Sequence, residues 1–409
     1  MTLPVPRTDV PPELIADFDI LDLGLSEPHG RLAELRDNCP VAYVPRYEGY
    51  WVVTRYDDIR RITTDWESFS NSSVAIPYFV ESGLDDTTIP LEIDPPDHGH
   101  YREIMNPLFS PRRMKALEEE IRASAVGLIE RFAHRGECEF ISEFAHPLPS
   151  NTFIALMGWP PEDVDDFARW TDEILVGKPG GSPDEDLAVR VAANEAAQAY
   201  FRATIAARRA SPVEGDSTSV LINAMFNAER PLSDNELVRT LRLLMLGGLH
   251  TVRASLGYGM VRLAENPDQR AKLIADPSLL PSAVEEILRI DAPVATARVV
   301  AKPVKIGDAE MKPGDKVLVS LPAAGQDPSE FDCPVAFRVD RKPNRHLTFS
   351  SGPHRCIGSN LARVELTIAF DELLRRIPDF EVVRPPRRHH GQVRGMYDLP
   401  IRFTPEPTT

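Results

Sequence analysis

The sequence predicts a mostly α-helical fold with small β-sheets, and three observations lead to that prediction. From about residue 98 onward, apolar residues recur at helical spacing along most of the chain. The segment 233–265 is long for a globular helix, and its middle is apolar nearly all round, which is typical of a helix buried at the centre of a large fold. Short strand-like runs occur towards both ends of the sequence.

The N-terminal part of the chain predicts an extended arm followed by a hairpin. Four prolines within the first twelve residues favour an extended arm over residues 1–14. Alternating residues predict paired strands at 41–44 and 50–54, joined by a turn at Glu48-Gly49. A helix is expected from Tyr56, because the two aspartates that follow it suit a first helical turn.

The rest of the chain predicts a succession of helices and then short strands. Ser-Pro, Pro-Pro and Ser-Asp pairs mark several helix starts, where a capping side chain or a proline suits the first turn. The helices are expected at 98–108, 111–134, 142–157, 161–176, 184–210, 216–227, 233–265, 267–275 and 280–290. The later strands are expected at 297–300, 304–306, 316–320, 380–384 and 399–404, with a turn at 312–315. No linker divides the sequence, so we expect a single domain over residues 1–409.

Composition and charge exclude several classes of function. The chain has 46 basic and 62 acidic residues and a formal net charge of −16. Such a chain is a poor general binder of nucleic acid, because phosphate contacts need a basic surface. The sequence shows neither a signal peptide nor an apolar stretch long enough to cross a membrane. The four cysteines are widely spaced and favour neither a disulfide framework nor a structural zinc site, so we expect a cytoplasmic location.

The most informative stretch surrounds Cys356, in the run FSSGPHRCIG at residues 349–358, directly before a predicted helix from Ser359. Glycines allow a tight turn and the close approach of a flat partner. Backbone N–H groups at a helix start and the neighbouring His354 and Arg355 favour the thiolate form of a cysteine. A thiolate there is a nucleophile or a metal ligand, and the alternative is a small buried cysteine without chemistry.

The spacing FxxGxxxCxG of this stretch resembles the heme-binding loop of the cytochrome P450 family. Three further matches follow the order of that family. Glu286-Ile-Leu-Arg289 resembles its ExxR motif, the segment from Pro334 to Arg341 resembles its PxxFxxxR segment, and 247–251 lies in the long helix where the family has its oxygen-activation motif. The resemblance covers residues 15–405.

The resemblance implies the cytochrome P450 fold, with a long central helix over a buried heme. It implies a structural network of Glu286, Arg289 and Arg341, and heme b (iron protoporphyrin IX) with Cys356 as the axial ligand of the iron. An axial thiolate favours cleavage of the O–O bond. The implied reaction is therefore monooxygenation, RH + O2 + 2 e⁻ + 2 H⁺ → ROH + H2O. The stretch 263–270 is similar to soluble bacterial members around the camphor-hydroxylating enzyme.

The two propionates of a heme need cationic or hydrogen-bonding partners. His98 and Arg102 share one helix face through their i,i+4 spacing and resemble the HxxxR element of the family. Arg298 and His346 stand where similar enzymes place the other propionate ligands. The alternative for each of them is a solvated surface residue. Two further histidines near these segments are expected at the surface, His100 and His354.

The long helix departs from the family pattern at one position. The family usually has an aspartate or glutamate before the threonine of the oxygen-activation motif, whereas this chain has His250 before Thr251. The resemblance implies that Thr251 hydrogen-bonds the distal oxygen or an ordered water. A histidine can pass protons near neutral pH, so His250 replaces the carboxylate, or it packs the helix and protons arrive by another route. The sequence leaves both interpretations open.

The substrate pocket implied by the resemblance is mostly apolar, which favours a small hydrophobic substrate. Asp86 falls where the camphor enzyme has a hydrogen-bonding tyrosine, and Thr88 replaces an aromatic residue, so camphor itself is not expected. A terpenoid or norisoprenoid of about ten to fifteen carbons is expected instead. The candidates for the pocket lining, each of which could also be ordinary core, are Phe79, Asp86, Thr88, Leu243, Leu246, Gly247, Val294, Thr296 and Val393.

The electrons must come from a separate protein, because the sequence has no flavin or nicotinamide fingerprint. A [2Fe-2S] ferredoxin with its flavin-dependent reductase is expected. Ferredoxins are acidic, so a basic docking patch is needed on the thiolate side, and scattered solvated charges are the alternative. The candidates for this patch are Arg112, Arg113, Arg355 and Arg363.

Two other functions are compatible with the Cys356 loop. A heme-thiolate enzyme that uses peroxide would carry a different pattern in the long helix, and Thr251 argues against it. A heme-binding sensor without enzymatic activity would not need Thr251 or the closed apolar helix. We therefore expect a monooxygenase.

Overall fold

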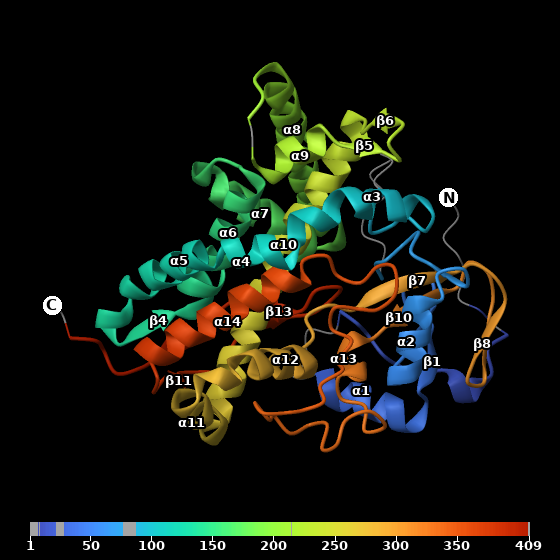
Figure 1. Cartoon of the computed structure of the whole chain (residues 1–409). Coiled ribbons are helices and arrows are strands. Elements are labelled where there is room, and N and C mark those ends of the chain that lie inside the picture. The colour runs from blue at the N-terminus through green and yellow to red at the C-terminus, as the bar shows by residue number, and fades with distance from the viewer. Residues whose placement is uncertain (1–6, 8, 22–27, 77–86, 214, 408–409) are drawn as a thin grey trace.

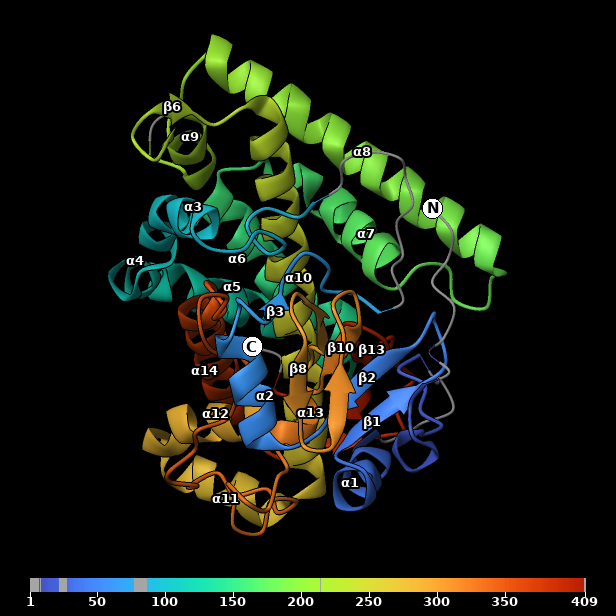
Figure 2. The ribbon, with the colours of Figure 1, turned by 90° about the vertical axis from the view of Figure 1, so that its right-hand side faces the viewer.

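The structure is a computed structural model of the chain and describes residues 7, 9–21, 28–76, 87–213 and 215–407. Figures 1 and 2 show most of the helices gathered on one side of the molecule and the largest β-sheet, with a few short helices, on the other. The prediction of a mostly helical fold with small sheets is confirmed. Within the described parts of the chain, no helix is both long and apolar enough to cross a membrane.

Helix α10 (Asp234–Glu265) crosses the centre of the molecule, as its near-continuous apolar sequence predicts (Figure 2). It begins at a capping box, in which the Ser233 side chain accepts from the Glu236 backbone N–H and the Glu236 carboxylate accepts from the Ser233 backbone N–H. This arrangement satisfies two backbone donors that the start of a helix otherwise leaves unpaired.

Two glycines let α10 approach its neighbours closely. A Cβ atom at Gly248 would lie 2.4 Å from the ring of Phe153 in α6 (Pro147–Met157). A Cβ atom at Gly259 would lie 2.3 Å from the ring of Phe370 in α14 (Ser359–Arg376). Both distances are far below van der Waals contact, so any larger residue at these positions would push the helices apart.

The largest sheet has five strands in the order β1-β2-β10-β7-β3. The predicted hairpin forms its edge, with Val41 opposite Val53 and Val44 opposite Tyr50, and β10 runs parallel to β2. The hairpin turn requires a left-handed backbone at Gly49, where φ is 86°. The strands of this sheet are β1 (Val41–Val44), β2 (Tyr50–Val53), β10 (Lys316–Val319), β7 (Thr296–Val300) and β3 (Phe69–Ser70).

Short strand pairs and further helices complete the fold. The smaller sheets consist of β11 (Glu381–Val382), β14 (Pro400–Arg402) and β4 (Glu137–Glu139), of β12 (Arg388–His389) with β13 (Gly395–Met396), of β5 (Met225–Phe226) with β6 (Arg230–Pro231), and of β8 (Val304–Ile306) with β9 (Ala309–Met311). The other α-helices are α1 (Pro28–Asn38), α2 (Tyr56–Thr64), α3 (Asp97–Met105), α4 (Pro111–Ala116), α5 (Glu118–Glu130), α7 (Val164–Leu175), α8 (Pro183–Ala210), α9 (Ser217–Ile222), α11 (Pro267–Ala275), α12 (Leu280–Ile290) and α13 (Leu321–Ala324). Several elements were not predicted from the sequence, namely α1, α13, β3, β4, β5, β6, β9 and the β12–β13 hairpin.

Several predicted helices are shorter than expected, and two of them differ most from the prediction. The helix predicted at 111–134 is divided at Leu117 into α4 and α5, and a run of glutamates from Glu118 favours the new helix start because the backbone dipoles there attract negative charge. The helix predicted at 216–227 ends at Ile222 as α9, and the chain then forms β5 and β6, joined by a turn in which Asn227 and Ala228 adopt left-handed conformations.

The predicted extended arm is only partly within the described residues. Pro12–Leu14 forms one turn of 3-10 helix instead of an extended chain, since a proline suits the first position of a helical turn. Before this turn, Arg7 donates a hydrogen bond of 2.6 Å to Asp315, the residue that precedes β10, and is thereby held beside the large sheet.

The predicted structural network is present around the carboxylate of Glu286, which is fully buried in α12. Arg289 donates to it with two hydrogen bonds of 2.7 and 2.9 Å, and Arg341 with two of 3.0 Å. The remaining donors of both arginines bind backbone carbonyl oxygens of residues 325–336. The network therefore fixes this irregular segment against α12.

Replacing Arg341 by methionine is expected to lower the free energy of unfolding by about 3–5 kcal/mol, because the change removes two hydrogen bonds to the buried Glu286 carboxylate and the donors to the carbonyl oxygens of Asp332 and Cys333. Chemical denaturation followed by circular dichroism measures this. Arg338→Met is the matched control: the Arg338 side chain is about half exposed, so its loss is expected to cost no more than about 0.5 kcal/mol. Equal effects of the two changes would contradict the structural role of the network.

Candidate functional site

Cys356 lies in a compact loop that leads into α14. The Cys356 backbone N–H donates to the Phe349 carbonyl oxygen at 2.9 Å, which closes the loop. Gly352 has a left-handed φ of 71°, and a Cβ atom there would lie 2.5 Å from the Thr63 carbonyl oxygen of α2. Glycine at this position therefore allows the loop to turn and to lie directly against α2.

The Cys356 thiol is exposed at its tip, although dense protein surrounds the loop. Burial raises the pKa of the thiol, while the Gly358 N–H that donates to it and the nearby charges of Arg102, Arg355 and Arg363 oppose that rise. The protein groups alone therefore favour the thiolate only in part, and a metal ion bound to the sulfur would complete the deprotonation.

Beside this loop the structure brings together two imidazoles and two guanidinium groups. The rings of His98 in α3 and His354 lie 4.1 Å apart between centroids, and the positive charges of Arg298 and Arg102 act on His354. The Nε2 atoms of both histidines are buried and have no hydrogen-bond partner among the described residues. Buried polar atoms are nearly always paired, so these two point to a polar ligand.

Burial disfavours the charged forms of the side chains in this cluster. Burial lowers the pKa of Arg298 to about 10 and the pKa of His98 to about 4. Burial is also the first cause that lowers the pKa of His354 to about 2. An anion placed among these groups would stabilise their protonated forms.

The cluster corrects the expectation for His354, which was placed at the surface but is 9% exposed. The signal that could have identified it is its position two residues before Cys356, which places it in the same loop. Arg102 is bound to that loop too, since its Nη1 donates to the Arg355 carbonyl oxygen at 2.8 Å. His100, expected at the surface, is partly exposed.

The structure does not place His346 in this cluster, although it was expected to bind a propionate. The His346 Nε2 lies 3.0 Å from an Oε2 of Glu285, and Arg363 donates to both oxygens of the same carboxylate at 2.6 and 2.9 Å. Burial alone would raise the pKa of Glu285, but these hydrogen bonds lower it to about 2. The ionised carboxylate of Glu285 is therefore hydrogen-bonded to both His346 and Arg363.

The middle of α10 has one open face. Gly247 is exposed, whereas its neighbours in the middle of α10 are buried or partly buried, and a Cβ atom there would meet nothing within 4 Å. Leu243, Leu246 and Thr251 are partly buried along the same stretch. The Thr251 hydroxyl donates to the Gly247 carbonyl oxygen at 2.9 Å, so its oxygen can still accept a hydrogen bond from a ligand on this face.

The other predicted pocket residues are described in part. Phe79 and Asp86 lie outside the described residues. Thr88, Thr296, Val294 and Val393 are partly buried, and the last two are joined by an isolated β-bridge.

A residue that the sequence analysis missed adjoins these: Arg242 of α10 is buried and donates to the Thr88 hydroxyl at 3.3 Å and to Asn194 of α8 at 2.7 Å. The surroundings of Thr88 are therefore more polar than predicted.

His250 lies on another side of α10 and is 1% exposed. Its Nε2 is 3.9 Å from an oxygen of Asp172 in α7. Burial, followed by the charge of Arg253, lowers the pKa of His250 well below its ordinary value. The ring is therefore neutral near pH 7.

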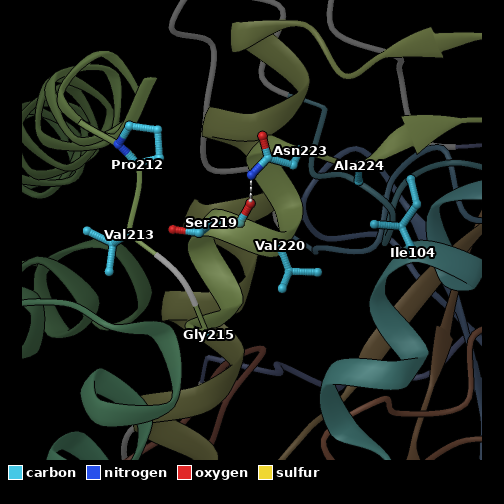
Figure 3. A pocket seen from close by; sticks show the side chains of 8 residues that line it. All are labelled: Ile104, Pro212, Val213, Gly215, Ser219, Val220, Asn223 and Ala224. Atoms are coloured by element: carbon cyan, nitrogen blue, oxygen red, sulfur yellow. Dashed lines mark hydrogen bonds between the residues drawn. The ribbon is translucent and has the colours of Figure 1, made fainter. Parts of the chain in front are cut away.

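A surface groove of about 630 Å³ lies apart from Cys356, between α3 and the region of α9 (Figure 3). None of the residues proposed for catalysis or heme binding lines it. Its lining residues are Ile104, Pro212, Val213, Gly215, Ser219, Val220, Asn223 and Ala224.

Comparison with known proteins identifies the class to which this fold and site belong. The family model for cytochrome P450 matches residues 183–392. The chain is 37% identical over 348 residues to the steroid C26-monooxygenase of Mycobacterium tuberculosis (strain CDC 1551 / Oshkosh), covering 83% of this chain and 91% of that protein. The chain belongs to the cytochrome P450 family and is a heme-dependent monooxygenase.

Two solved structures agree with this assignment. The crystal structure of CYP101J2 matches with a TM-score of 0.86 and 31% identity, over 97% of this chain and 99% of that one. CYP109E1 from Bacillus megaterium in complex with testosterone matches with a TM-score of 0.86 and 29% identity, over 93% and 99% of the two chains. The predicted family, fold and cofactor are thereby confirmed.

The residues around Cys356 fit the heme of this family. An exposed thiol can bind iron, two orphaned imidazole nitrogens and two guanidinium groups can bind propionates, and the open face at Gly247 leaves room for a flat group.

Replacing His354 by leucine is expected to weaken heme binding about tenfold to a hundredfold, since one hydrogen bond to a charged group contributes about 1.5–3 kcal/mol. Transfer of heme to apomyoglobin measures the loss. His346→Leu is the comparison, because the Glu285 hydrogen bond of His346 leaves it outside the cluster, and its heme affinity is expected to stay within about threefold. The reverse order of the two effects would contradict the assignment of His354.

Proposed function

We propose that the chain acts as a single domain that hydroxylates a small hydrophobic substrate with O2 and two electrons from a ferredoxin. The observations that support this best are the Cys356 loop with its neighbouring imidazoles and guanidinium groups, and the open face of α10 at Thr251. A thiolate site and a hydroxyl that can still accept a hydrogen bond are the groups that oxygen activation needs.

We assign a role to each residue of the site. Cys356 binds the heme iron, and His98, Arg102, Arg298 and His354 hold the two propionates. The bound heme supplies the cleavage of dioxygen, which no side chain can perform. Thr251 orients a proton donor through its free acceptor position, and the half-buried apolar side chains of α10 exclude water from the substrate.

We propose a terpenoid or norisoprenoid of about ten to fifteen carbons as the substrate. Leu243, Leu246, Val294 and Val393 offer apolar contacts, which fit a hydrocarbon skeleton. The Arg242–Thr88 pair adds hydrogen-bonding groups, which fit a keto or hydroxyl oxygen on that skeleton. A relative is named for a steroid, so a larger substrate is the alternative that the experiment must separate.

We propose that the electron donor is a [2Fe-2S] ferredoxin with a flavin-dependent reductase. Of the four arginines considered for docking, Arg112 and Arg355 are exposed. Arg363 binds Glu285, and Arg113 donates to Ser217 of α9 at 3.1 Å. The docking patch is therefore narrower than the sequence predicted and centres on Arg112 and Arg355.

A ligand screen by shift of the heme Soret band tests the substrate class. Oxygenated terpenoids and norisoprenoids are expected to bind at least about tenfold more tightly than testosterone, as the proposed substrate size requires. Ligands that shift the band are then turned over with a surrogate ferredoxin, and hydroxylated product is expected. Tighter binding of testosterone would reject the small substrate, and absence of product from every shifting ligand would reject the oxygenase.

Replacing Thr251 by alanine is expected to lower the yield of product per electron pair by about tenfold or more and to raise peroxide, because the hydroxyl that orients the proton donor is lost. Product and peroxide are measured against NADH consumed. Thr251→Ser keeps a hydroxyl and is expected to retain most of the coupling. A Thr251→Ala variant that couples as well as the parent enzyme would show that protons arrive without this residue.

A further inference from the structure

Two buried imidazoles lie side by side between α10 and the β12–β13 hairpin. His250 and His389, the latter in β12, are each 1% exposed, and their ring centroids are 5.1 Å apart. None of their four ring nitrogens has a hydrogen-bond partner among the described residues. Buried polar atoms that lack a protein partner are usually bound by ordered water, so four such atoms in one place indicate a hydrated site.

The site reaches the surface through a carboxylate. Asp172 of α7 is 38% exposed, and one of its oxygens lies 3.9 Å from the Nε2 of His250. Arg253 of α10 donates to both oxygens of Asp172 at 2.7 and 2.8 Å and to the Nδ1 of His146 at 3.0 Å. Asp172 is thereby held between solvent and the two rings, while His250 immediately precedes Thr251 in the chain.

The backbone of β13 closes the site on its other side. A Cβ atom at Gly395 would lie 2.6 Å from the Nε2 of His389 and 3.3 Å from the Cε1 of His250. Glycine is therefore needed for the strand to lie against both rings. On the far side of His389, the ring of Tyr397 lies 5.1 Å away between centroids.

Both rings are neutral at physiological pH. Burial comes first among the causes, and it lowers the pKa of His389 to about 3 with the help of His250, Arg253 and His390 against the opposing charge of Asp172. Burial, Arg253 and His146 act in the same direction on His250. A neutral imidazole has one N–H donor and one acceptor nitrogen, so it can continue a chain of hydrogen bonds in both directions.

We propose that His250 and His389 hold ordered water between Asp172 and the middle of α10, and that this hydrated pair is the route by which protons reach Thr251. His389 is thus a positioning residue for the reaction. A proton from solvent enters beside Asp172 and passes through water to the acceptor nitrogen of one ring, while the proton on the other nitrogen of that ring leaves. One N–H bond forms and one breaks, so the ring stays neutral. The protons are the two that monooxygenation consumes.

The last part of this route, from His250 to Thr251, rests on the role proposed for Thr251. A metal ion is not the favoured occupant, because the described residues contain no group of three or more side chains that could hold one.

A high-resolution crystal structure of the heme-loaded enzyme tests the hydration directly. A water oxygen is expected within about 3.2 Å of a nitrogen of His250 and of a nitrogen of His389. Rings that contact each other or the protein with no water between them would overturn the proposal. This measurement does not depend on turnover.

Replacement of His389 by phenylalanine tests the transfer, because the change keeps a ring and removes both nitrogens. We expect product per NADH to fall about fivefold to tenfold, peroxide to rise and the solvent isotope effect on turnover to increase. His389→Gln keeps hydrogen-bonding atoms and is expected to recover at least half of the coupling. Equal losses in the two variants would show that His389 only packs.

Tyr397→Phe is the matched control, since Tyr397 contacts the His389 ring but contributes none of the unpaired nitrogens. Its coupling is expected to stay within about twofold of the parent enzyme. In a His250→Phe/His389→Phe double variant, the loss is expected to equal that of one single variant, because both residues serve one route. Additive losses would overturn the shared route.

The outcome is separable from the proposed function. If Thr251→Ala uncouples the enzyme and His389→Phe does not, the histidine route is wrong and the role of Thr251 stands. If neither change affects coupling, both are wrong.

Discussion

The carboxylate of Glu286 has no exposed surface, and its two oxygens accept hydrogen bonds from Arg289, Arg341, Asn344 and the backbone N–H of Arg338. A buried carboxylate is stable only if such donors surround it, so the segment that carries them must adopt one conformation. That segment continues into the Cys356 loop, which is joined to the same helix where Thr348 donates to the Leu288 carbonyl oxygen at 2.7 Å. The position of the thiol thus depends on this network.

Helix α10 separates two chemical environments. Its open face presents Gly247 and the Thr251 hydroxyl, and a Cβ atom at Gly247 would meet nothing within 4 Å. A different face buries His250 among Asp172, Arg253 and His146, where charges compensate one another. Because consecutive residues of a helix point about 100° apart, one short stretch can line an apolar space and also contact a polar interior.

The electrostatics on the two sides of the Cys356 loop differ in kind. On one side, the guanidinium groups of Arg102 and Arg298 lie with the imidazoles of His98 and His354, whose Nε2 atoms are orphaned, and these groups fit an anionic ligand. On the other, Glu285 already pairs with His346 and Arg363. Two histidines in one segment therefore have different roles, and what separates them is the presence of a carboxylate nearby.

The sequence by itself determined the features that depend on local pattern. The apolar run of α10, the helix starts, the hairpin at residues 41–53 and the motifs around Cys356 and Glu286 were predicted because periodicity, capping and fixed spacing are properties of neighbouring residues. The tertiary structure alone decided which distant side chains meet. It placed His354 and not His346 beside His98, set Arg242 against Thr88, and brought His389 to His250 from a part of the chain more than a hundred residues away. Such contacts depend on how helices and strands pack. Apart from His354, whose spacing from Cys356 places it in the same loop, no spacing within one segment encodes them.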